Sequence, residues 1–262
     1  MKKPQLLSFI SDEKLFEQVK RVLDVAKASS SEADGRLFTN TIDPFSALFD
    51  AMCQGISLKQ WLEQEKARQT QKTLQNALGE FHQEILGSIP GWVSLGKGNV
   101  FDLKNDSLKI IAEVKNKYNT TKGNHKVAIY DDLSGQLKTK YKDYTAYYVE
   151  IIPKSRVAYD KPFTPSDNRT HERRAARKDI RVIDGKSFYG LATDDPEAIS
   201  KFYEVLPIVI KKLLRADNPG GEYSQQSFDV GMSRDLPKRN KEGNYPASDA
   251  DCEYTKLFER VY

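Results

Sequence analysis

The chain has 262 residues, enough to bury a substantial core in one large domain or two small ones. Apolar residues make up 39% and charged residues 30%, a polar but globular composition without the run of about 18 apolar residues that a membrane span needs. The N-terminus lacks the long apolar core and cleavage site of a signal peptide. The two cysteines, Cys53 and Cys252, lie far apart, which argues against a disulfide framework or zinc site and fits a reducing cytoplasm.

Positive charge is concentrated in two segments, although the formal net charge of +4 is modest. Residues 104–142 carry nine basic and four acidic side chains, and residues 154–181 carry the same numbers. A polyanion would fit beside such segments. On charge alone, an ordinary solvated surface is the simpler explanation of both.

The first third of the chain is predicted to be helical. Apolar residues recur at helical spacing over residues 11–28, and Asp43-Pro44 is a favourable start for a second helix. Residues 57–86 are expected to form one long helix or two in series, ended by Gly87. The apolar face of the second helix consists of Phe45, Leu48, Phe49 and Met52.

Strands are predicted to follow these helices. Apolar runs bounded by turn residues indicate strands at residues 93–95, 99–103, 108–115, 145–153 and 180–183. Further helices are predicted over residues 126–141 and 196–214, and Asp184-Gly185 is interpreted as a turn. This order favours an α/β (α+β-like) fold with a central mixed β-sheet flanked by helices.

The chain contains no boundary that argues for two independent domains. We expect a single domain over residues 1–262, with a helical N-terminal region (1–88) and a catalytic core (89–215). The remaining segment, residues 216–262, is rich in Gly, Pro, Asn and Ser and is expected to be loop-rich.

The stretch from Asp102 to Lys115 carries the strongest functional signal. Side chains alternate between the two faces of a strand, so Glu113 and Lys115 would share a face about 7 Å apart at ~3.3 Å per residue. An adjacent strand ending at Asp102 would bring a second carboxylate beside them. Two carboxylates and a lysine suit Mg²⁺ and an attacked phosphate, because Mg²⁺ prefers oxygen ligands and a lysine can stabilise phosphate charge or steer the attacking water. A surface ion pair of little energetic value is the non-functional alternative.

A third acid, Glu80, lies beside the buried face of the preceding predicted helix. It would either reach the same metal or remain a solvated helix residue. Other chemistries lack support, because the three histidines are scattered and there is no nucleophile elbow, P-loop or dinucleotide-binding glycine motif. Metal-assisted hydrolysis is therefore the chemistry that the sequence favours.

Several blocks of the chain together resemble one group of nucleases. Asp102 followed by Glu113-Val114-Lys115 resembles the PD-(D/E)xK nuclease superfamily, although Phe101 stands where the motif has proline. Spread between about residues 42 and 215, five blocks resemble the type II restriction endonucleases that cut GGNCC or GGWCC. These blocks are Ile42–Phe45, Gln71–Asn76, Gly79–Gln83, Glu113–Thr120 (the most specific) and Ile183–Tyr189.

This resemblance implies a Mg²⁺-dependent enzyme that cuts double-stranded DNA at a short palindromic site and leaves 5′-phosphates. By position, Asp102 and Glu113 would bind Mg²⁺, and Lys115 would orient or activate the attacking water. Glu80 would add a metal contact. The resemblance further implies a homodimer, because a two-fold protein matches a two-fold site. It also implies a companion DNA methyltransferase in the host and a place in a prokaryotic cytoplasm.

Three segments are candidates for DNA contacts, because Arg, Lys and Asn read base edges and hold phosphates. They supply Asn116, Lys117 and Asn119, then Arg169, Arg173, Arg174 and Arg177, and finally Arg234, Lys238 and Arg239. Two alternatives remain open beside restriction. One is a structure-selective repair or junction nuclease of the same fold, and the other is a non-catalytic DNA-binding module.

Overall fold

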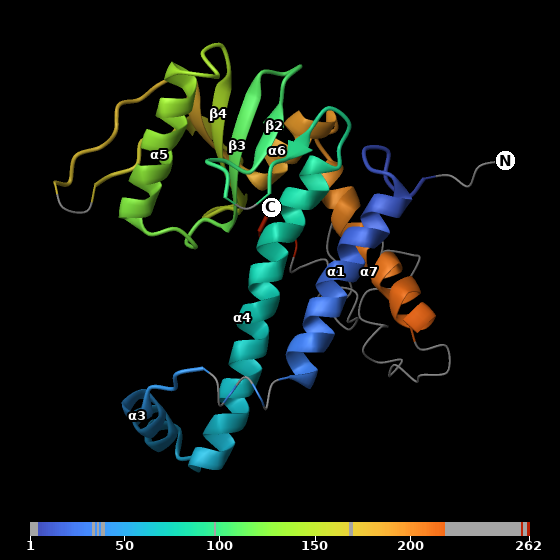
Figure 1. The fold of residues 1–262 in the computed structure, drawn as a ribbon, viewed down its shortest axis with the longest axis vertical. Coiled ribbons are helices and arrows are strands. Elements are labelled where there is room, and N and C mark those ends of the chain that lie inside the picture. The colour runs from blue at the N-terminus through green and yellow to red at the C-terminus, as the bar shows by residue number, and fades with distance from the viewer. Residues whose placement is uncertain are drawn as a thin grey trace, which may run out of the picture.

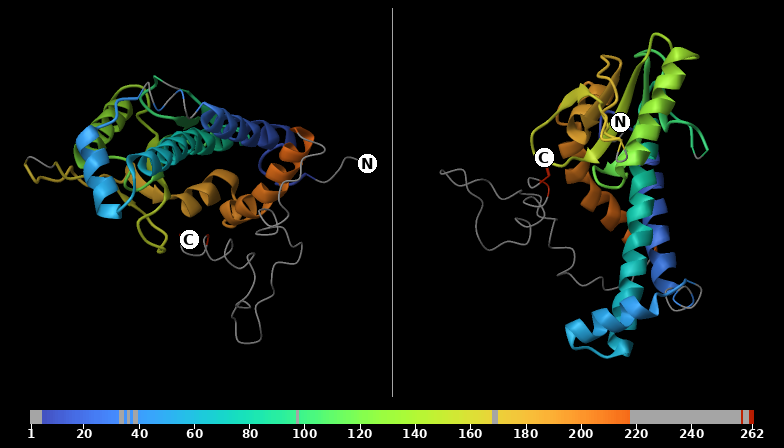
Figure 2. Two further views of the ribbon diagram at one scale, coloured as in Figure 1. Left: turned by 90° about the horizontal axis from the view of Figure 1, so that it is seen from below. Right: turned by 90° about the vertical axis from the view of Figure 1, so that its left-hand side faces the viewer.

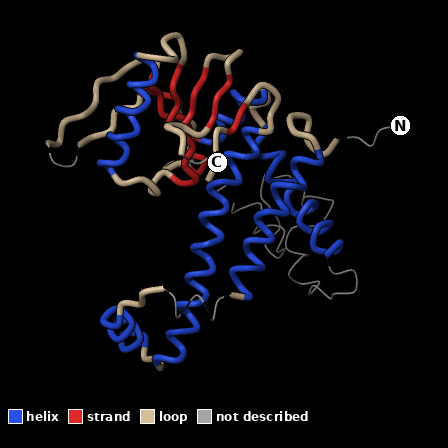
Figure 3. Tube along the Cα trace, in the orientation of Figure 1, coloured by secondary structure: helices blue, strands red, loops and turns tan. Residues whose placement is uncertain are grey.

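The centre of the molecule is a mixed six-stranded β-sheet with the strand order β1-β2-β3-β4-β6-β5 (Figures 1 and 3). This computed structural model describes residues 5–32, 35, 37, 40–96, 98–167, 170–217, 258 and 261–262. The strands are β1 (Val93–Ser94), β2 (Leu103–Asn105), β3 (Ile110–Lys117), β4 (Thr145–Ile152), β5 (Asp160–Pro162) and β6 (Ile180–Asp184). Strands β3, β4 and β6 are parallel, whereas β1, β2 and β5 pair antiparallel with their neighbours. The predicted mixed sheet flanked by helices is confirmed.

Helices cover both faces of this sheet (Figure 2). On one face, Ile111 belongs to a buried cluster that includes residues of α5 (Gly123–Lys138). On the other face, Ile110, Ala112 and Val114 belong to a larger buried cluster. That cluster draws on α1 (Asp12–Ser31), α4 (Leu58–Gly87), α6 (Gly185–Thr193) and α7 (Ala198–Asp217). The alternation predicted along β3 is therefore observed.

A single long helix, α4, extends from the sheet to a separate small helix. Its N-terminus has a capping box, in which Ser57 and Gln60 bond each other's backbone amides. At this far end lies α3 (Pro44–Gln54), which is capped by the Asp43 carboxylate (Figure 1). We call α3 together with residues 58–68 of α4 the arm.

Several local structures differ from the sequence predictions. β3 begins and ends two residues later than expected, after a turn in which Lys109 adopts φ 55°. The sequence at Asp184-Gly185 starts α6 instead of forming a turn, because the Asp184 carboxylate accepts hydrogen bonds from the Ser187 amide (3.0 Å) and hydroxyl (2.7 Å). The short edge strand β5 was not predicted. Most of the predicted loop-rich segment 216–262 lies outside the described residues.

Among the described helices, none combines the length and apolar character that crossing a membrane requires.

Candidate active site

Asp102 lies beside Glu113, close enough for the two carboxyl groups to interact, where β2 and β3 pair. Leu103 is opposite Ala112, and the Asp102 amide donates to the carbonyl of the same Ala112 (3.0 Å). The backbone amide of Val114 donates to Asp102 Oδ2 (2.7 Å), which holds this carboxylate against β3. The residue that precedes β2 therefore supplies the second carboxylate. The predicted strand over residues 99–103 was wrong in position, because β2 begins only at Leu103, directly after Asp102.

Glu113 and Lys115 share one face of β3, as predicted, and the structure shows that this face points toward α5. Lys115 Nζ donates to Glu113 Oε1 (2.5 Å). The Glu113 side chain is 13% exposed and that of Lys115 is 24% exposed. Both groups are therefore largely removed from water, which distinguishes this contact from an ordinary surface ion pair.

The two carboxylates are costly to ionise together. Burial, and next the charge of Asp102, raise the pKa of Glu113 to about 7 against the attraction of Lys115. Burial also raises the pKa of Asp102, although the hydrogen bond from Val114 and the charge of Lys115 oppose this shift. Like charges in a partly desolvated place favour the protonated forms. A cation between them would remove the repulsion.

The residues present fit a divalent cation with hard oxygen ligands. Mg²⁺ is commonly held by one or two carboxylates, while water and substrate phosphate oxygens complete its octahedron. Within the described part of the chain, no three His, Cys, Asp or Glu side chains group closely enough to hold a metal ion. The pair thus suits a metal shared with a phosphate better than a closed site made only of protein ligands.

Glu80, the expected third metal ligand, is not brought to this pair. Its side chain is exposed on α4, and it forms no metal-holding group with the two carboxylates. The next residue, Phe81, enters the core, so the helix turns Glu80 toward solvent. α4 reaches β3 one turn further along, where the Gln83 side-chain amide donates to the Val114 carbonyl (3.3 Å).

A buried carboxylate that the sequence reasoning missed lies next to Lys115. Glu150 is the β4 partner of Lys115 in the parallel pairing and is only 7% exposed. Lys126 Nζ donates to Glu150 Oε1 (2.6 Å) and to the Tyr118 carbonyl (2.9 Å), and the Tyr159 hydroxyl donates to Glu150 Oε2 (2.6 Å). These bonds connect the loop after β3, the start of α5 and the segment before β5. The sequence signal that could have identified Glu150 is its position as the one acidic residue within the largely apolar strand β4.

The first group of predicted DNA contacts continues directly from Lys115. Asn116 and Lys117 are the half-buried last residues of β3, and Asn119 is exposed in the turn that follows. In the second group, Arg173 is exposed and its guanidinium donates to a backbone carbonyl (3.2 Å). These side chains are available at the surface for contacts with a polyanion.

Two further predicted DNA contacts, Arg174 and Arg177, are already engaged within the protein. Arg174 makes two bonds to the Asp131 carboxylate (2.8 and 2.7 Å). Arg177 makes two bonds to Asp179 (2.8 and 2.5 Å) and one to Ser134 Oγ (2.9 Å). Asp131 and Ser134 belong to α5, so these two arginines attach the segment between β5 and β6 to that helix. Outside the described residues lie Arg169, Arg234, Lys238 and Arg239.

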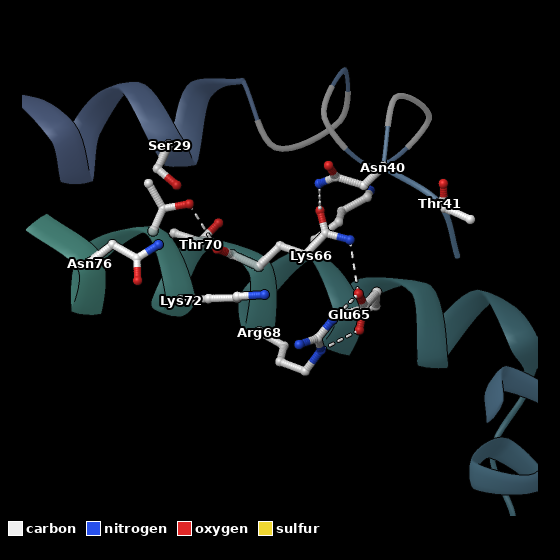
Figure 4. A pocket seen from close by; sticks show the side chains of 11 residues that line it. Ser29, Asn40, Thr41, Glu65, Lys66, Arg68, Thr70, Lys72 and Asn76 are labelled. Carbon is white, nitrogen blue, oxygen red and sulfur yellow. Dashed lines mark hydrogen bonds and ion pairs between the residues drawn. The ribbon is translucent and has the colours of Figure 1, made fainter. Parts of the chain in front are cut away.

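Sizeable cavities lie along α4, away from the carboxylate pair. One of 560 Å³ opens between α1 and α4 and is lined mainly by polar side chains (Figure 4). Another of 780 Å³ lies beside α3. Neither cavity is lined by Asp102, Glu113 or Lys115, so the carboxylate pair lies outside both.

Comparison with known proteins identifies the family. A family model described as Eco47II restriction endonuclease matches residues 7–215, a range that includes Asp102, Glu113 and Lys115. The type II restriction enzyme Eco47II of Escherichia coli is 44% identical over 229 residues, 86% of this chain and 93% of that enzyme. The type II restriction enzyme Sau96I of Staphylococcus aureus is 29% identical over 247 residues, 93% of this chain and 92% of that enzyme. No solved structure matches significantly. The resemblance to type II restriction endonucleases is confirmed, and the chain belongs to the Eco47II restriction endonuclease family.

Proposed function

We propose that this restriction endonuclease hydrolyses phosphodiester bonds of double-stranded DNA with Mg²⁺ held by Asp102 and Glu113. The observation that carries the proposal is the partly buried carboxylate pair with Lys115 beside it. The raised pKa values of both carboxyl groups reflect a repulsion that a bound cation would relieve. A structural ion pair would have no need of the second carboxylate.

Each residue of the site has a separate task in this reaction. When bound, Mg²⁺ would polarise the scissile phosphate and lower the pKa of a coordinated water molecule. The Lys115 ammonium would orient the attacking water or stabilise the charge that develops on the phosphate. The Val114 amide holds the Asp102 carboxylate in place before substrate arrives, which reduces the cost of reaching the reactive geometry. Water attacks phosphorus and the bond to the 3′ oxygen breaks, which leaves a 5′-phosphate and a 3′-hydroxyl.

The proposed substrate is a short palindromic site of the GGNCC or GGWCC type. The sequence blocks that resemble enzymes with this specificity support it, and the similarity to two type II restriction enzymes supports cleavage at a specific DNA site. A homodimer would place one catalytic centre on each strand. A companion DNA methyltransferase would protect the host genome, and both proteins would work in a prokaryotic cytoplasm.

Asn116, Lys117, Asn119 and Arg173 are the described residues that we propose for DNA contacts. The first three follow Lys115 along the chain, so they would meet DNA close to the scissile phosphate. Arg174 and Arg177 would act indirectly by holding the segment that carries Arg173, because their guanidinium groups already bind carboxylates.

Digestion of a plasmid of known sequence, followed by mapping of the ends, tests this function. We expect discrete fragments with Mg²⁺ and none with EDTA, and every end should carry a 5′-phosphate within a GGNCC-like or GGWCC-like sequence. Ends at unrelated sequences, or cutting confined to branched DNA, would instead indicate a structure-selective nuclease. Salt-sensitive binding without nicking in any divalent metal would indicate a non-catalytic module.

A further inference from the structure

An apolar surface is exposed on α3, at the end of the arm furthest from the sheet. Its residues recur at helical spacing on the face opposite Ala47 and Ala51, which pack against Trp61. The sequence predicted this apolar face, but the structure turns it toward solvent. We call it the α3 patch, and it consists of Phe45, Leu48, Phe49, Met52 and the neighbouring Leu58, each between 50% and 73% exposed.

The α3 patch is large for a surface with no partner. Its five side chains expose roughly 600 Å², since a large apolar side chain presents on the order of 200 Å² when fully exposed. Contiguous apolar patches above a few hundred Å² mark interaction sites on soluble proteins. A specific protein interface buries about 800 Å² on each partner, so the patch could supply most of the apolar core of one.

The chemistry of α3 argues for a protein partner and against DNA. The helix contains one charged residue, Asp50, and neither Lys nor Arg. The Asp43 carboxylate caps its N-terminus and adds negative charge. A surface that contacts the DNA backbone needs positive charge.

The apolar side chains of the α3 patch lie partly along a groove and partly outside it. A groove of 780 Å³ lies between α3 and α4 and is lined by Phe45, Phe49 and Trp61 together with polar residues. Leu48 and Met52 are exposed but do not line this groove. In a two-fold contact each copy offers the same surface, so the exposed Leu48 and Met52 of one chain would meet apolar side chains of the other.

A side-chain hydrogen bond orders α3 against α4, and further bonds lie within α4. The Trp61 indole donates to Asp50 Oδ2 (2.9 Å), which joins α3 to α4. Within α4, Glu65 accepts two bonds from Arg68 (2.6 and 2.5 Å; Figure 4). It also accepts one from Gln69 (2.8 Å). Such pre-ordering lowers the entropic cost of association.

We propose that the α3 patch is the surface through which two copies of this chain form a two-fold dimer. Between Trp61 and Gln83, α4 spans about 33 Å at ~1.5 Å per residue, so the contact leaves the carboxylate pair of each copy free. The proposal rests on the proposed function for its purpose, because cutting both strands of a palindrome requires two catalytic centres. The contact itself involves neither DNA nor metal.

Sedimentation equilibrium without DNA or Mg²⁺ tests this surface. We expect the wild-type chain to be mostly dimeric at roughly 10 µM, which corresponds to a dissociation constant near 1 µM or below. The double variant Phe45→Glu/Phe49→Glu should raise that constant by about a hundredfold or more, because it places charge on an apolar contact. The matched control Val157→Glu changes a side chain that is 74% exposed outside the arm, and it should leave the constant unchanged.

Two results would overturn the proposal. One is a wild-type chain that is monomeric under these conditions. The patch would then be covered by DNA, by another protein or by another part of the chain, and not by a second copy. The other is a double variant that dimerises as tightly as wild type while its circular dichroism spectrum shows a native fold. If the double variant fails to fold, Met52→Glu alone provides the same comparison. Failure to cleave DNA by an intact dimer would contradict the proposed function without affecting this surface.

Discussion

Replacing Lys126 with methionine would leave the carboxylate of Glu150 buried without its cation. The pair lies at the start of α5, where Lys126 also binds the Tyr118 carbonyl and lies 5.2 Å from the centre of the Tyr148 ring. The Glu150 side chain is 9% exposed and the Lys126 side chain 23%. The substitution therefore tests how much this buried network contributes to the stability of the fold.

The expected cost follows from the asymmetry of the pair. Removing one partner of a buried ion pair typically costs about 3–5 kcal/mol. Since Tyr159 still donates to Glu150, we expect Lys126→Met to lower the free energy of unfolding by about 3 kcal/mol. Glu150→Gln should cost about 1–2 kcal/mol, because Lys126 keeps the Tyr118 carbonyl and access to water. The double variant should cost less than the sum of the two, with a coupling energy of about 2 kcal/mol.

Urea-induced unfolding at neutral pH in EDTA measures these free energies. Arg174→Met is a matched control, because it breaks the more exposed ion pair between Arg174 and Asp131 of the same helix, and its effect should be clearly smaller. Equal costs for Lys126→Met and Arg174→Met would refute the reasoning. So would additive effects of Lys126→Met and Glu150→Gln.

Three further predictions concern His82, the glycines and the metal. Burial lowers the pKa of His82 to about 4, so its neutral form favours the folded state and stability is lost as pH falls below about 6.5. Relative to His82→Gln, wild-type protein should gain about 2 kcal/mol between pH 5 and pH 7 in urea unfolding, and parallel curves would contradict this assignment. Gly185→Ala should destabilise by about 2 kcal/mol because the new Cβ would lie 2.3 Å from the Ile151 carbonyl oxygen. Gly79→Ala, with open space around it, should stabilise by about 0.5–1 kcal/mol, and calorimetry that ranks the two the other way would disprove this packing argument. Finally, Mg²⁺ should raise the thermal unfolding midpoint of the wild type but not of Asp102→Asn/Glu113→Gln, and an equal rise in both would place the metal elsewhere.

Local patterns were sufficient to predict the strand at the centre of the site. Alternation correctly placed Glu113 and Lys115 on one face of β3, because strand periodicity depends only on neighbouring residues. From the sequence we expected Asp102 to come close to Glu113 on an adjacent strand, but the sequence could not show how that strand pairs with β3. The actual basis of this proximity is the ladder of the β2–β3 hairpin, in which Leu103 is opposite Ala112, and the sequence pattern misplaced the start of β2.

Features that depend on tertiary contacts were not predictable from local pattern. Helical spacing identified the apolar side of α3, but periodicity does not reveal what covers such a side, and here it is solvent. The clustered arginines suggested DNA contacts, whereas Arg174 and Arg177 find partners on α5 that lie 43 residues earlier in the chain. Glu150 was overlooked because its cation, Lys126, comes from a different element.

The rate of plasmid cleavage by Lys115→Ala in Mg²⁺, measured under single-turnover conditions, tests the central claim most directly. Lys104→Ala is the matched control, because Lys104 lies in the neighbouring strand β2 with 25% of its side chain exposed, compared with 24% for Lys115. We expect Lys115→Ala to bind the DNA with nearly unchanged affinity and to cleave it at least about a hundredfold more slowly, while Lys104→Ala cuts normally. Cleavage by Lys115→Ala at close to the wild-type rate would contradict the assignment of this site.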